Sequence, residues 1–499
     1  MKKSGLNVAS ELLEENVSVR GGKIAVCCEE ERVTYKELSE NVNRFANVLS
    51  ELNVAPTERV LIVLPDSPTW LYAFLGTIKY GAWPVPVNTM LNEEDYRYML
   101  EDSEARVLVT GKDHKAARAK RAGFCYKLFS DNGLQSFMNA ASPEARSYPT
   151  NEEDIAFWLY SSGSTGKPKG TPHRHIDMIH SADNYAGKIL GMKESDICFS
   201  VSKLFFAYGL GNGLAFPLRY GASVVQLPTP PSPDAVLSTV ANCKPTVFFG
   251  VPTQYNSILK RPETRDAFKS VRACVSAGEA LPPEIFNRWK NLTGLEILDG
   301  IGSTEALHIF ISNRQGEVRP GTSGRVVSGY EAKIVADDGK EVPPGEPGNL
   351  IIRGESITRG YWDRPEENAE KLLPDGWFKT GDVYRQEDGY FIYSGRGDDM
   401  LKVGGIWVSP IEIENVLMAH EAVNEAAVVG REVEGLVKPF AYVTLNEGFK
   451  DREDRDTGEE LLHFVSERLP KFKWLRAVHF VEELPKTATG KIQRFKLRG

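Results

Sequence analysis

The run YSSGSTGKPKG, from Tyr160 to Gly170, combines small hydroxyl residues, glycines and lysines. Glycines let a backbone approach a ligand closely and present its N–H groups, hydroxyls donate further hydrogen bonds, and lysine supplies a point charge. The apolar run DIAFWLY directly before it predicts a strand that ends at this loop. The combination predicts a loop that holds phosphate groups. A flexible surface loop is the alternative.

Other familiar nucleotide or nucleophile patterns do not fit this chain. A Walker A loop requires G-x-x-x-x-G-K-[ST], but Ser161 stands at the first glycine and Pro168 at the hydroxyl position. The Rossmann pattern fails at Leu214, where a third glycine would follow Gly209 and Gly211. No G-x-S-x-G elbow occurs. A P-loop ATPase, a dinucleotide-binding enzyme and a serine hydrolase are therefore disfavoured.

The elements that must position this loop alternate between strands and helices over the first three hundred residues. Short apolar runs such as RVLIVL, ARVLVTG, ASVVQLP, PTVFFGVP and VRACVSAGE each stand beside a more helical segment. This alternation predicts an α/β fold of mostly parallel sheets covered by helices on both faces. Because open α/β sheets bind ligands at the carboxyl ends of their strands, we expect the chemistry in the loops that follow them.

The pattern changes near Gly324. YEAKIVADDGKEVPPGEPGNLIIRG and DGYFIYSGR predict strands of a β-rich subdomain over about 324–395. The glycine-rich run Gly395–Gly405 predicts a linker, and beyond it two helices and three strands predict a small α+β domain. The prediction is therefore a large N-terminal domain, 1–395, followed by a smaller C-terminal domain, 396–499.

Composition and charge exclude several classes. A hydrophobic content of 41% and a charged content of 26% are globular values. A formal net charge of −8 without a long basic run disfavours nucleic-acid binding, which depends on Lys and Arg meeting phosphates. The stretch Trp70–Val87 is interrupted by Lys79, glycines and prolines, so no membrane span is predicted.

Cysteines and the N-terminus indicate the compartment. The six cysteines include no C-x-x-C pair, so neither a zinc site nor a redox motif is predicted, and reduced thiols fit a reducing environment. Glu11, Glu14 and Glu15 fall where a signal peptide needs an apolar core. We expect a cytoplasmic protein. A homodimer is left open, because oligomeric state cannot be read from these features.

Four further motifs follow the phosphate loop: DGIGSTEA (Asp299–Ala306), TGD (Thr380–Asp382), GRGDDMLKVGGIWVSPIEIE from Gly395, and PKTATGKIQR (Pro485–Arg494). With the loop, they resemble the signature motifs of the adenylate-forming superfamily, which includes acyl-CoA synthetases, adenylation domains and luciferases. They occur in the family's order and cover essentially the whole chain. The resemblance implies that ATP activates a carboxylate as an acyl-adenylate.

The resemblance also implies roles for the catalytic residues. Glu305 is similar to the family's Mg²⁺ ligand, and a carboxylate suits a hard cation. Thr304 is expected to hydrogen-bond the α-phosphate. Lys491 resembles the lysine that meets the carboxylate and the α-phosphate as charge develops, and such stabilisation is commonly the largest catalytic effect. Alone, each would more often be a structural or solvated side chain; their joint occurrence in order outweighs this.

The nucleotide is expected to bind between several of these motifs. Asp382 would accept hydrogen bonds from the ribose diol, with Arg396 beside it as a fixed donor. SAGEALP (Ser276–Pro282) and Asp299–Gly302 would enclose the adenine. The predicted ATP- and AMP-binding residues are Ser161, Ser162, Gly163, Ser164, Thr165, Gly166, Lys167, Lys169, Ala277, Gly278, Glu279, Asp299, Gly300, Ile301, Thr304, Asp382 and Arg396.

The hinge motif implies a moving C-terminal domain. Asp398 aligns with the family's hinge residue, so the C-terminal domain is expected to swing after adenylation and to withdraw Lys491. The loop with Lys402, Gly404 and Gly405 would then line the tunnel for the pantetheine arm of CoA, whose thiol attacks the acyl-adenylate.

The acyl pocket resembles that of benzoate–CoA ligases. KLFFAYGLGNGLAFPL (Lys203–Leu218), EALHIFIS and KVGGIWVSP are similar to the corresponding segments of that subfamily. The positions carried over as pocket lining are Ala207, Tyr208, Gly302, His308 and Ile309. Small residues leave room for a flat ring, Tyr208 and Ile309 offer apolar faces, and His308 either limits the depth or contacts a ring edge.

These expectations combine into an AMP-forming carboxylate–CoA ligase acting on benzoate, with Mg²⁺, ATP and CoA. Alternatives left open are ligases for hydroxybenzoate, aminobenzoate or an alicyclic acid, and a stand-alone carrier-loading aryl acid adenylation enzyme. A luciferase-like oxidoreductase would need an oxygen-reactive substrate. A non-enzymatic nucleotide-binding module would be expected to lack Lys491 or Glu305, and both are present.

Overall fold

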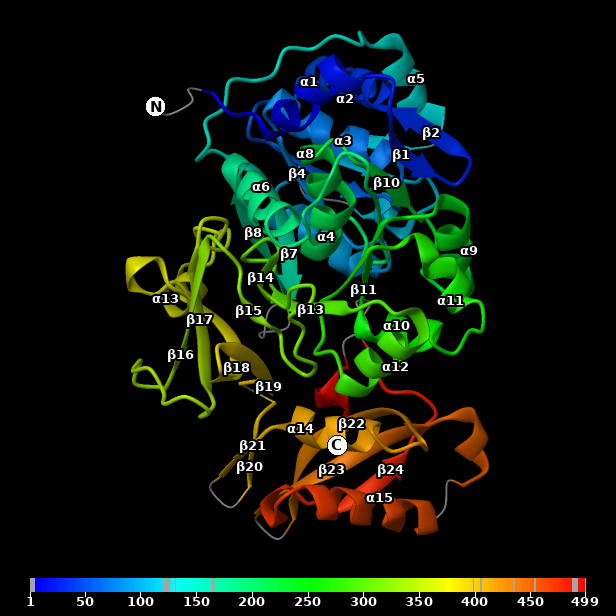
Figure 1. Cartoon of the computed structure of the whole chain (residues 1–499). Helices are drawn as coiled ribbons and strands as arrows, with labels where there is room; N and C mark the ends of the chain where they lie inside the picture. Colours follow the sequence, from blue (N-terminus) through cyan, green and yellow to red (C-terminus); the bar gives the residue numbers. More distant parts are fainter. Residues whose placement is uncertain are drawn as a thin grey trace.

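A computed structural model describes residues 5–119, 126–130, 132–162, 167–397, 399–403, 406–433, 436–452, 455–486 and 492–498. Figure 1 shows a large body formed by the first three hundred residues, a β-rich sheet beside it, and a small C-terminal unit below both. In these described ranges no helix is long and apolar enough to cross a membrane.

The largest sheet has nine strands in the order β15-β14-β13-β12-β11-β9-β10-β1-β2. Neighbours from β13 to β1 pair in parallel, while β14, β15 and β2 pair antiparallel at the two edges. Central strands such as VFFG and ACVS are buried throughout, because helices cover both faces. The bounds are β1 Ile24–Cys28, β2 Glu31–Thr34, β9 Ile197–Ser200, β10 Ser223–Gln226, β11 Val247–Gly250, β12 Ala273–Ser276, β13 Ile297–Gly302, β14 Ile309–Ser312 and β15 Arg325–Val326.

A second sheet, in the order β4-β3-β5-β6, is parallel throughout. Its strands are β3 Arg59–Val63, β4 Trp83–Pro86, β5 Val107–Thr110 and β6 Tyr126–Phe129. The two sheets confirm the predicted α/β class with mostly parallel strands. The helices of this part are α1 Val8–Arg20, α2 Tyr35–Glu51, α3 Pro68–Tyr80, α4 Glu93–Asp102, α5 Asn132–Ala140, α6 His175–Ser181, α7 Ala207–Leu210, α8 Phe216–Arg219, α9 Pro233–Cys243, α10 Pro252–Ile258, α11 Thr264–Ala267 and α12 Pro283–Thr293.

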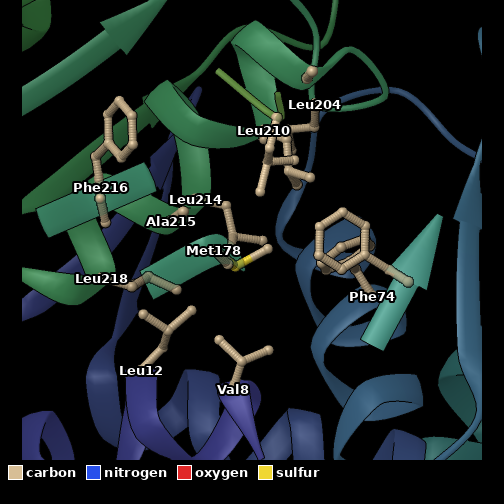
Figure 2. Close-up of a cluster of buried hydrophobic side chains, with 14 of the residues drawn as sticks. Val8, Leu12, Phe74, Met178, Leu204, Leu210, Leu214, Ala215, Phe216 and Leu218 are labelled. Atoms are coloured by element: carbon tan, nitrogen blue, oxygen red, sulfur yellow. The ribbon is translucent and has the colours of Figure 1, made fainter. Parts of the chain in front are cut away.

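The main core lies under the segment that the sequence assigns to the acyl pocket. Figure 2 shows side chains of α7, α8 and the π-helical turn between them, Gly211–Ala215, gathered over α1 and α6. Leu214, Phe216 and Leu218 are buried there with Leu12 and Met178. Apolar packing against α1 and α6 therefore fixes the segment from α7 to α8.

The phosphate loop belongs to a separate antiparallel pair of strands. β7 (Ile155–Ser162) ends at the loop and β8 (Pro168–Arg174) leaves it, and Ser161 lies opposite Lys169 in their register. The predicted strand before the loop is confirmed.

The β-rich part forms an antiparallel sheet in the order β16-β17-β18-β19. Its strands are β16 Tyr330–Val335, β17 Gly348–Gly354, β18 Phe378–Glu387 and β19 Tyr390–Arg396, and helix α13 covers Pro365–Lys371. The strands predicted in YEAKIV, NLIIRG and DGYFIYSGR are all present.

The C-terminal unit packs two helices on a three-stranded sheet, in the order β22-β23-β24. Its elements are α14 Pro410–Met418, β22 Val423–Val433, β23 Leu436–Leu445, α15 Arg455–Arg468 and β24 Ala477–Phe480, preceded by the strand pair β20 Leu401–Val403 and β21 Ile406–Val408. The prediction of a linker over Gly395–Gly405 is therefore wrong for Leu401–Val403, which form a strand. Leu401 and Val403 are buried in the core of this unit, because their alternating side chains pack inward.

Buried His175 makes the fold acid-sensitive. Its Nδ1 accepts a hydrogen bond from the N–H of Val8 at 3.1 Å, so the neutral imidazole is bound. Burial lowers the pKa of His175 from 6.5 to about 4. Below pH 6.5 the unfolded chain gains a proton that the folded chain does not bind until about pH 4. We expect stability to fall across this window by up to about 3 kcal/mol.

Thermal unfolding at pH 7 and pH 4.5 tests this expectation. His175→Asn keeps an amide oxygen as acceptor but does not ionise, so its melting temperature should fall less on acidification than that of the unsubstituted chain. His463, an exposed residue of α15, supplies the control His463→Asn. Equal acid sensitivity in all three proteins would contradict the assignment.

Candidate active site

A cleft lies where the carboxyl ends of the central strands, the β-rich sheet and the C-terminal unit meet. The nine-stranded sheet contributes the end of β13 and the loop after β12, and α14 and β22 face it from the C-terminal unit. Its lining includes Ser161, Lys169, Gly278, Glu279, Gly300, Ile301, Gly302, Thr304, Glu305, Tyr361, Thr380, Asp382, Arg396, Asp399, Glu414, Ile492 and Arg494. Residues from all five sequence motifs are thereby brought to one place.

The phosphate loop meets the cleft through the ends of its two strands. Ser161 and Lys169 line the cleft. Lys169 is buried, with 5% of the residue exposed. Its ammonium nitrogen lies 3.3 Å from Glu367 Oε1 and 5.4 Å from the ring centroid of Tyr361. Lys167 is exposed, with its ammonium 5.3 Å from the ring centroid of Tyr98. Of the two predicted lysines, only Lys169 therefore faces the cleft.

Several predicted residues cannot be placed. Gly163, Ser164, Thr165 and Gly166 of the loop lie outside the described residues, as do Asp398, Gly404, Gly405 and Lys491. Ser162 is described only as the last residue of β7. The roles of all nine stay predictions.

The loop after β13 carries Thr304 and Glu305 and is bound along its backbone. His173 Nε2 donates to the Thr304 carbonyl at 2.8 Å, and the Nδ1 of His173 lies 3.3 Å from the buried carboxylate of Asp177. The Thr358 N–H donates to the Glu305 carbonyl at 2.8 Å. Two consecutive carbonyls are thus fixed by groups from distant parts of the chain.

The Glu305 carboxylate has one described side-chain donor. Tyr361 donates its hydroxyl to Glu305 Oε1 at 2.8 Å. Among the described residues, no group of three or more His, Cys, Asp or Glu gathers as a metal cage. The Glu305 carboxylate, which lines the cleft, fits Mg²⁺, because this ion is usually bound by one or two carboxylates together with substrate phosphates.

The ribose candidates form a cross-strand pair. Asp382 on β18 lies opposite Arg396 on β19, and Arg396 Nη1 donates to Asp382 Oδ1 at 3.4 Å. Thr380 Oγ1 accepts a hydrogen bond from the Asp382 N–H at 3.1 Å. The pair presents acceptor and donor groups side by side in the cleft, as recognition of a diol requires.

Some of the residues predicted to bind adenine line the cleft, and the others are buried. Gly278, Glu279, Gly300 and Ile301 line the cleft. Ala277, directly after β12, and Asp299, within β13, are buried and are not among its lining residues. Burial raises the pKa of Asp299 well above its ordinary value.

The acyl candidates adjoin the cleft at Gly302. A side-chain carbon at Gly302 would lie 2.6 Å from the His308 carbonyl, so glycine is needed for this close approach. Tyr208 is half-buried and donates its hydroxyl to the Gly250 carbonyl at 3.2 Å, and its ring centroid lies 5.5 Å from that of His308. Ala207 and Ile309 are buried beside them, at the start of α7 and of β14.

His308 is held by a residue that the sequence analysis missed. Its Nε2 lies 3.0 Å from Asn212 Oδ1, which accepts a hydrogen bond from it. A side-chain carbon at Gly211 would lie 2.5 Å from the His308 ring, so this glycine lets the imidazole rest against the helix. Burial lowers the pKa of His308 to about 3, so the ring is neutral at pH 7.

Some contacts near the predicted hinge lie within the C-terminal unit, and a further hydrogen bond joins this unit to the N-terminal part. Arg494 donates to Glu414 Oε2 at 2.7 Å and lies 3.8 Å from Asp399 Oδ2. Lys260 Nζ, in the turn after α10, donates to Asn424 Oδ1 of β22 at 2.6 Å and so joins the N-terminal part to the C-terminal unit. Lys402 is exposed on β20, with its ammonium 5.5 Å from the Trp407 ring centroid, and is not among the cleft-lining residues.

Tyr361, His173, Asn212 and Arg494 were not identified from the sequence. Tyr361 lies in RGYWDRP and His173 in TPHRHID, and neither run has a spacing that points to phosphate or metal binding. Arg494 is the last residue of the motif PKTATGKIQR, and no other feature of the sequence pointed to it. Their roles depend on partners far away in the sequence.

Comparisons with known proteins identify relatives over almost the whole chain. The family model described as AMP-binding enzyme matches residues 13–362, and that described as AMP-binding enzyme C-terminal domain matches residues 412–491. A benzoate–CoA ligase of Thauera aromatica is 46% identical over 506 residues, which cover 99% of this chain and 95% of that protein. A 4-hydroxybenzoate–CoA/benzoate–CoA ligase of Rhodopseudomonas palustris is 39% identical, with coverage of 99% and 94%.

Solved structures give the same picture. The structure of a benzoate CoA ligase from Burkholderia xenovorans has a TM-score of 0.93 and 45% identity, and covers 99% of this chain and 100% of that one. An anthranilate CoA ligase in complex with anthranoyl-AMP has a TM-score of 0.95 and 40% identity, with coverage of 99% and 97%.

Proposed function

This chain belongs to the family of AMP-binding enzymes, and on that premise we propose that it is an ATP-dependent, AMP-forming benzoate–CoA ligase. The observation that carries the proposal is the shared cleft. Glu305, Lys169 and the Asp382–Arg396 pair face it, and Gly302 joins it to the Tyr208–His308 pair. Nucleotide-binding groups and an aromatic-lined acyl site thus adjoin at one backbone position.

In the first step, a benzoate oxygen attacks the α-phosphorus of ATP. The bond from that phosphorus to the bridging oxygen breaks, and pyrophosphate leaves with the electron pair. Thr304 would hydrogen-bond the α-phosphate, and Lys491 would balance the charge that develops there. When bound, Mg²⁺ supplies positive charge to the phosphates, with Glu305 as its protein ligand.

In the second step, the CoA sulfur attacks the acyl carbonyl carbon and releases its proton to solvent. The bond from that carbon to the phosphate oxygen breaks, and AMP leaves with benzoyl-CoA as the other product. No enzyme nucleophile is needed. We assign residues 1–395 to the adenylation domain and 396–499 to a domain that swings about Asp398, so that Lys402, Gly404 and Gly405 reach the thiol path.

The acyl site favours a flat, uncharged ring. Tyr208, neutral His308 and Ile309 present apolar or aromatic faces, and Gly302 leaves space beside them. The same site would discriminate against a ring hydroxyl by about a hundredfold at most, because an apolar pocket rejects an added hydroxyl weakly. Similarity to an anthranilate CoA ligase and to a 4-hydroxybenzoate–CoA/benzoate–CoA ligase makes aminobenzoate and hydroxybenzoate the rival substrates.

Release of AMP and pyrophosphate tests this function. We expect turnover with ATP, Mg²⁺, CoA and benzoate, with kcat/KM highest for benzoate in a panel that includes 4-hydroxybenzoate, 2-aminobenzoate and cyclohexanecarboxylate. Benzoyl-CoA should form only when CoA is present. An acyl-adenylate that stays on the enzyme and is never transferred to CoA would instead favour a carrier-loading enzyme.

Two further expectations stay predictions. The substrates ATP, CoA and benzoate would be used in the cytoplasm, where reduced cysteines fit. A homodimer would be detected by light scattering of the purified chain.

A further inference from the structure

The segment Ser356–Asn368, here called the clamp segment, binds the loop that carries Glu305. Ser356 Oγ donates to the Ala306 carbonyl at 2.7 Å, and the Thr358 N–H donates to the Glu305 carbonyl at 2.8 Å. Tyr361 then donates its hydroxyl to the Glu305 carboxylate at 2.8 Å. The segment therefore fixes both the backbone and the side chain of the predicted metal ligand.

Tyr361 is itself held rigidly. Asn368 Oδ1 accepts from the Tyr361 N–H at 2.7 Å, and Asn368 Nδ2 donates to the Tyr361 carbonyl at 2.9 Å. Gly360 has a φ of +138°, and a side-chain carbon there would lie 2.9 Å from the Asn368 amide. The next residue, Trp362, attaches the clamp segment to β8, because its N–H donates to the Gly170 carbonyl at 2.8 Å. The backbone of Tyr361 and that of the following residue are therefore both fixed by hydrogen bonds.

Tyr361 also contacts the phosphate-loop lysine. Its ring lies under the ammonium of Lys169, 5.4 Å from the ring centroid, and Lys169 pairs with Glu367 of the clamp segment at 3.3 Å. A cation above an aromatic face is attracted by the electrons of the ring. One side chain, only 8% exposed, therefore contacts both Glu305 and Lys169, and both of these residues line the cleft.

We propose that Tyr361 is a positioning residue for the metal–nucleotide complex. By donating to Oε1, it sets the rotation of the Glu305 carboxylate and leaves Oε2 free to bind Mg²⁺ when MgATP is present, while its ring would hold Lys169 where it can meet the ATP phosphates. The inference rests on the proposed function, because it requires ATP in this cleft.

The test is binding of ATP to the full chain by calorimetry, with and without Mg²⁺. Tyr361→Phe keeps the ring but removes the hydroxyl. We expect its affinity for MgATP to fall roughly 10- to 100-fold, the range for a hydrogen bond to a charged group, while its affinity for metal-free ATP stays within about threefold. The matched control is Tyr96→Phe, which removes a buried hydroxyl that donates to the Asn88 carbonyl, away from the cleft.

A double-mutant cycle ties the effect to the carboxylate. In a Glu305→Gln background, Tyr361→Phe should cause little further loss of MgATP affinity, because the two groups act through one contact. Asn368→Ala provides a second route: it removes the two hydrogen bonds that hold Tyr361, and it should weaken MgATP binding selectively as well. These outcomes would support the inference.

Other outcomes overturn it. If Tyr361→Phe and Asn368→Ala weaken binding of MgATP and metal-free ATP equally, or leave both unchanged, Tyr361 does not position the metal–nucleotide complex. If the unsubstituted chain binds no MgATP at all, the proposed function fails, and the inference fails with it. The behaviour of the unsubstituted chain therefore separates the two failures.

Discussion

Replacement of Lys491 by alanine is expected to reduce benzoate-dependent pyrophosphate release on the order of a thousandfold. The adenylation step concentrates negative charge at the α-phosphorus, and removing a preorganised donor at such a position commonly costs a factor of 10² to 10³. A full positive charge lies at the upper end of that range. Ile492 and Arg494, close to Lys491 in the sequence, line the cleft, which supports this role.

The second half-reaction separates Lys491 from a structural role. With synthetic benzoyl-adenylate and CoA, Lys491→Ala should form benzoyl-CoA at nearly the unsubstituted rate, because the proposed domain swing would withdraw this lysine before the thiol attacks. Lys496, an exposed residue of the same segment, gives the control Lys496→Ala, which should be active in both steps. Loss of both half-reactions in Lys491→Ala would refute the domain-swing assignment.

Glu305→Gln is expected to slow adenylation on the order of a hundredfold and to raise the Mg²⁺ concentration needed for half-maximal rate. An amide oxygen carries no net charge and is a poorer partner for a hard cation than a carboxylate. The amide can still accept from Tyr361, so the loop should keep its position. The measurement is pyrophosphate release over a series of Mg²⁺ concentrations.

The Mg²⁺ dependence distinguishes this variant from Lys491→Ala, whose rate should be low at every Mg²⁺ concentration. The matched control is Glu317→Gln, at an exposed carboxylate that lies 3.6 Å from Arg325. Thioester formation from supplied benzoyl-adenylate should survive in Glu305→Gln. An unchanged Mg²⁺ requirement would remove Glu305 from the metal site.

Features contained in one contiguous stretch were predictable from the sequence. The strand before the phosphate loop, the strands of the β-rich sheet and the helices of the C-terminal unit follow from local apolar patterns. The residue types of the loop with Thr304 and Glu305 could also be read from one contiguous motif. Residues 163–166 and Lys491 lie outside the described residues, so their assignments still rest on sequence motifs.

The predicted linker shows where local signals fail. Glycines and charges in Gly395–Gly405 indicate flexibility, yet Leu401 and Val403 form a strand buried in the C-terminal core. A pattern of two alternating apolar residues is too short to outweigh the glycines around it. Pairing with β21 and packing against β23 in the C-terminal core decided the outcome.

By itself, the sequence determined the fold class and the order of the motifs, because both depend on residue types within short windows. Only the tertiary structure decided which groups meet. Tyr361 contacts Glu305 across 56 residues, His308 contacts Asn212 across 96, and His173 contacts Thr304 across 131. Apolar periodicity predicts that a face is buried, but the element it is buried against follows from the packing of the whole chain.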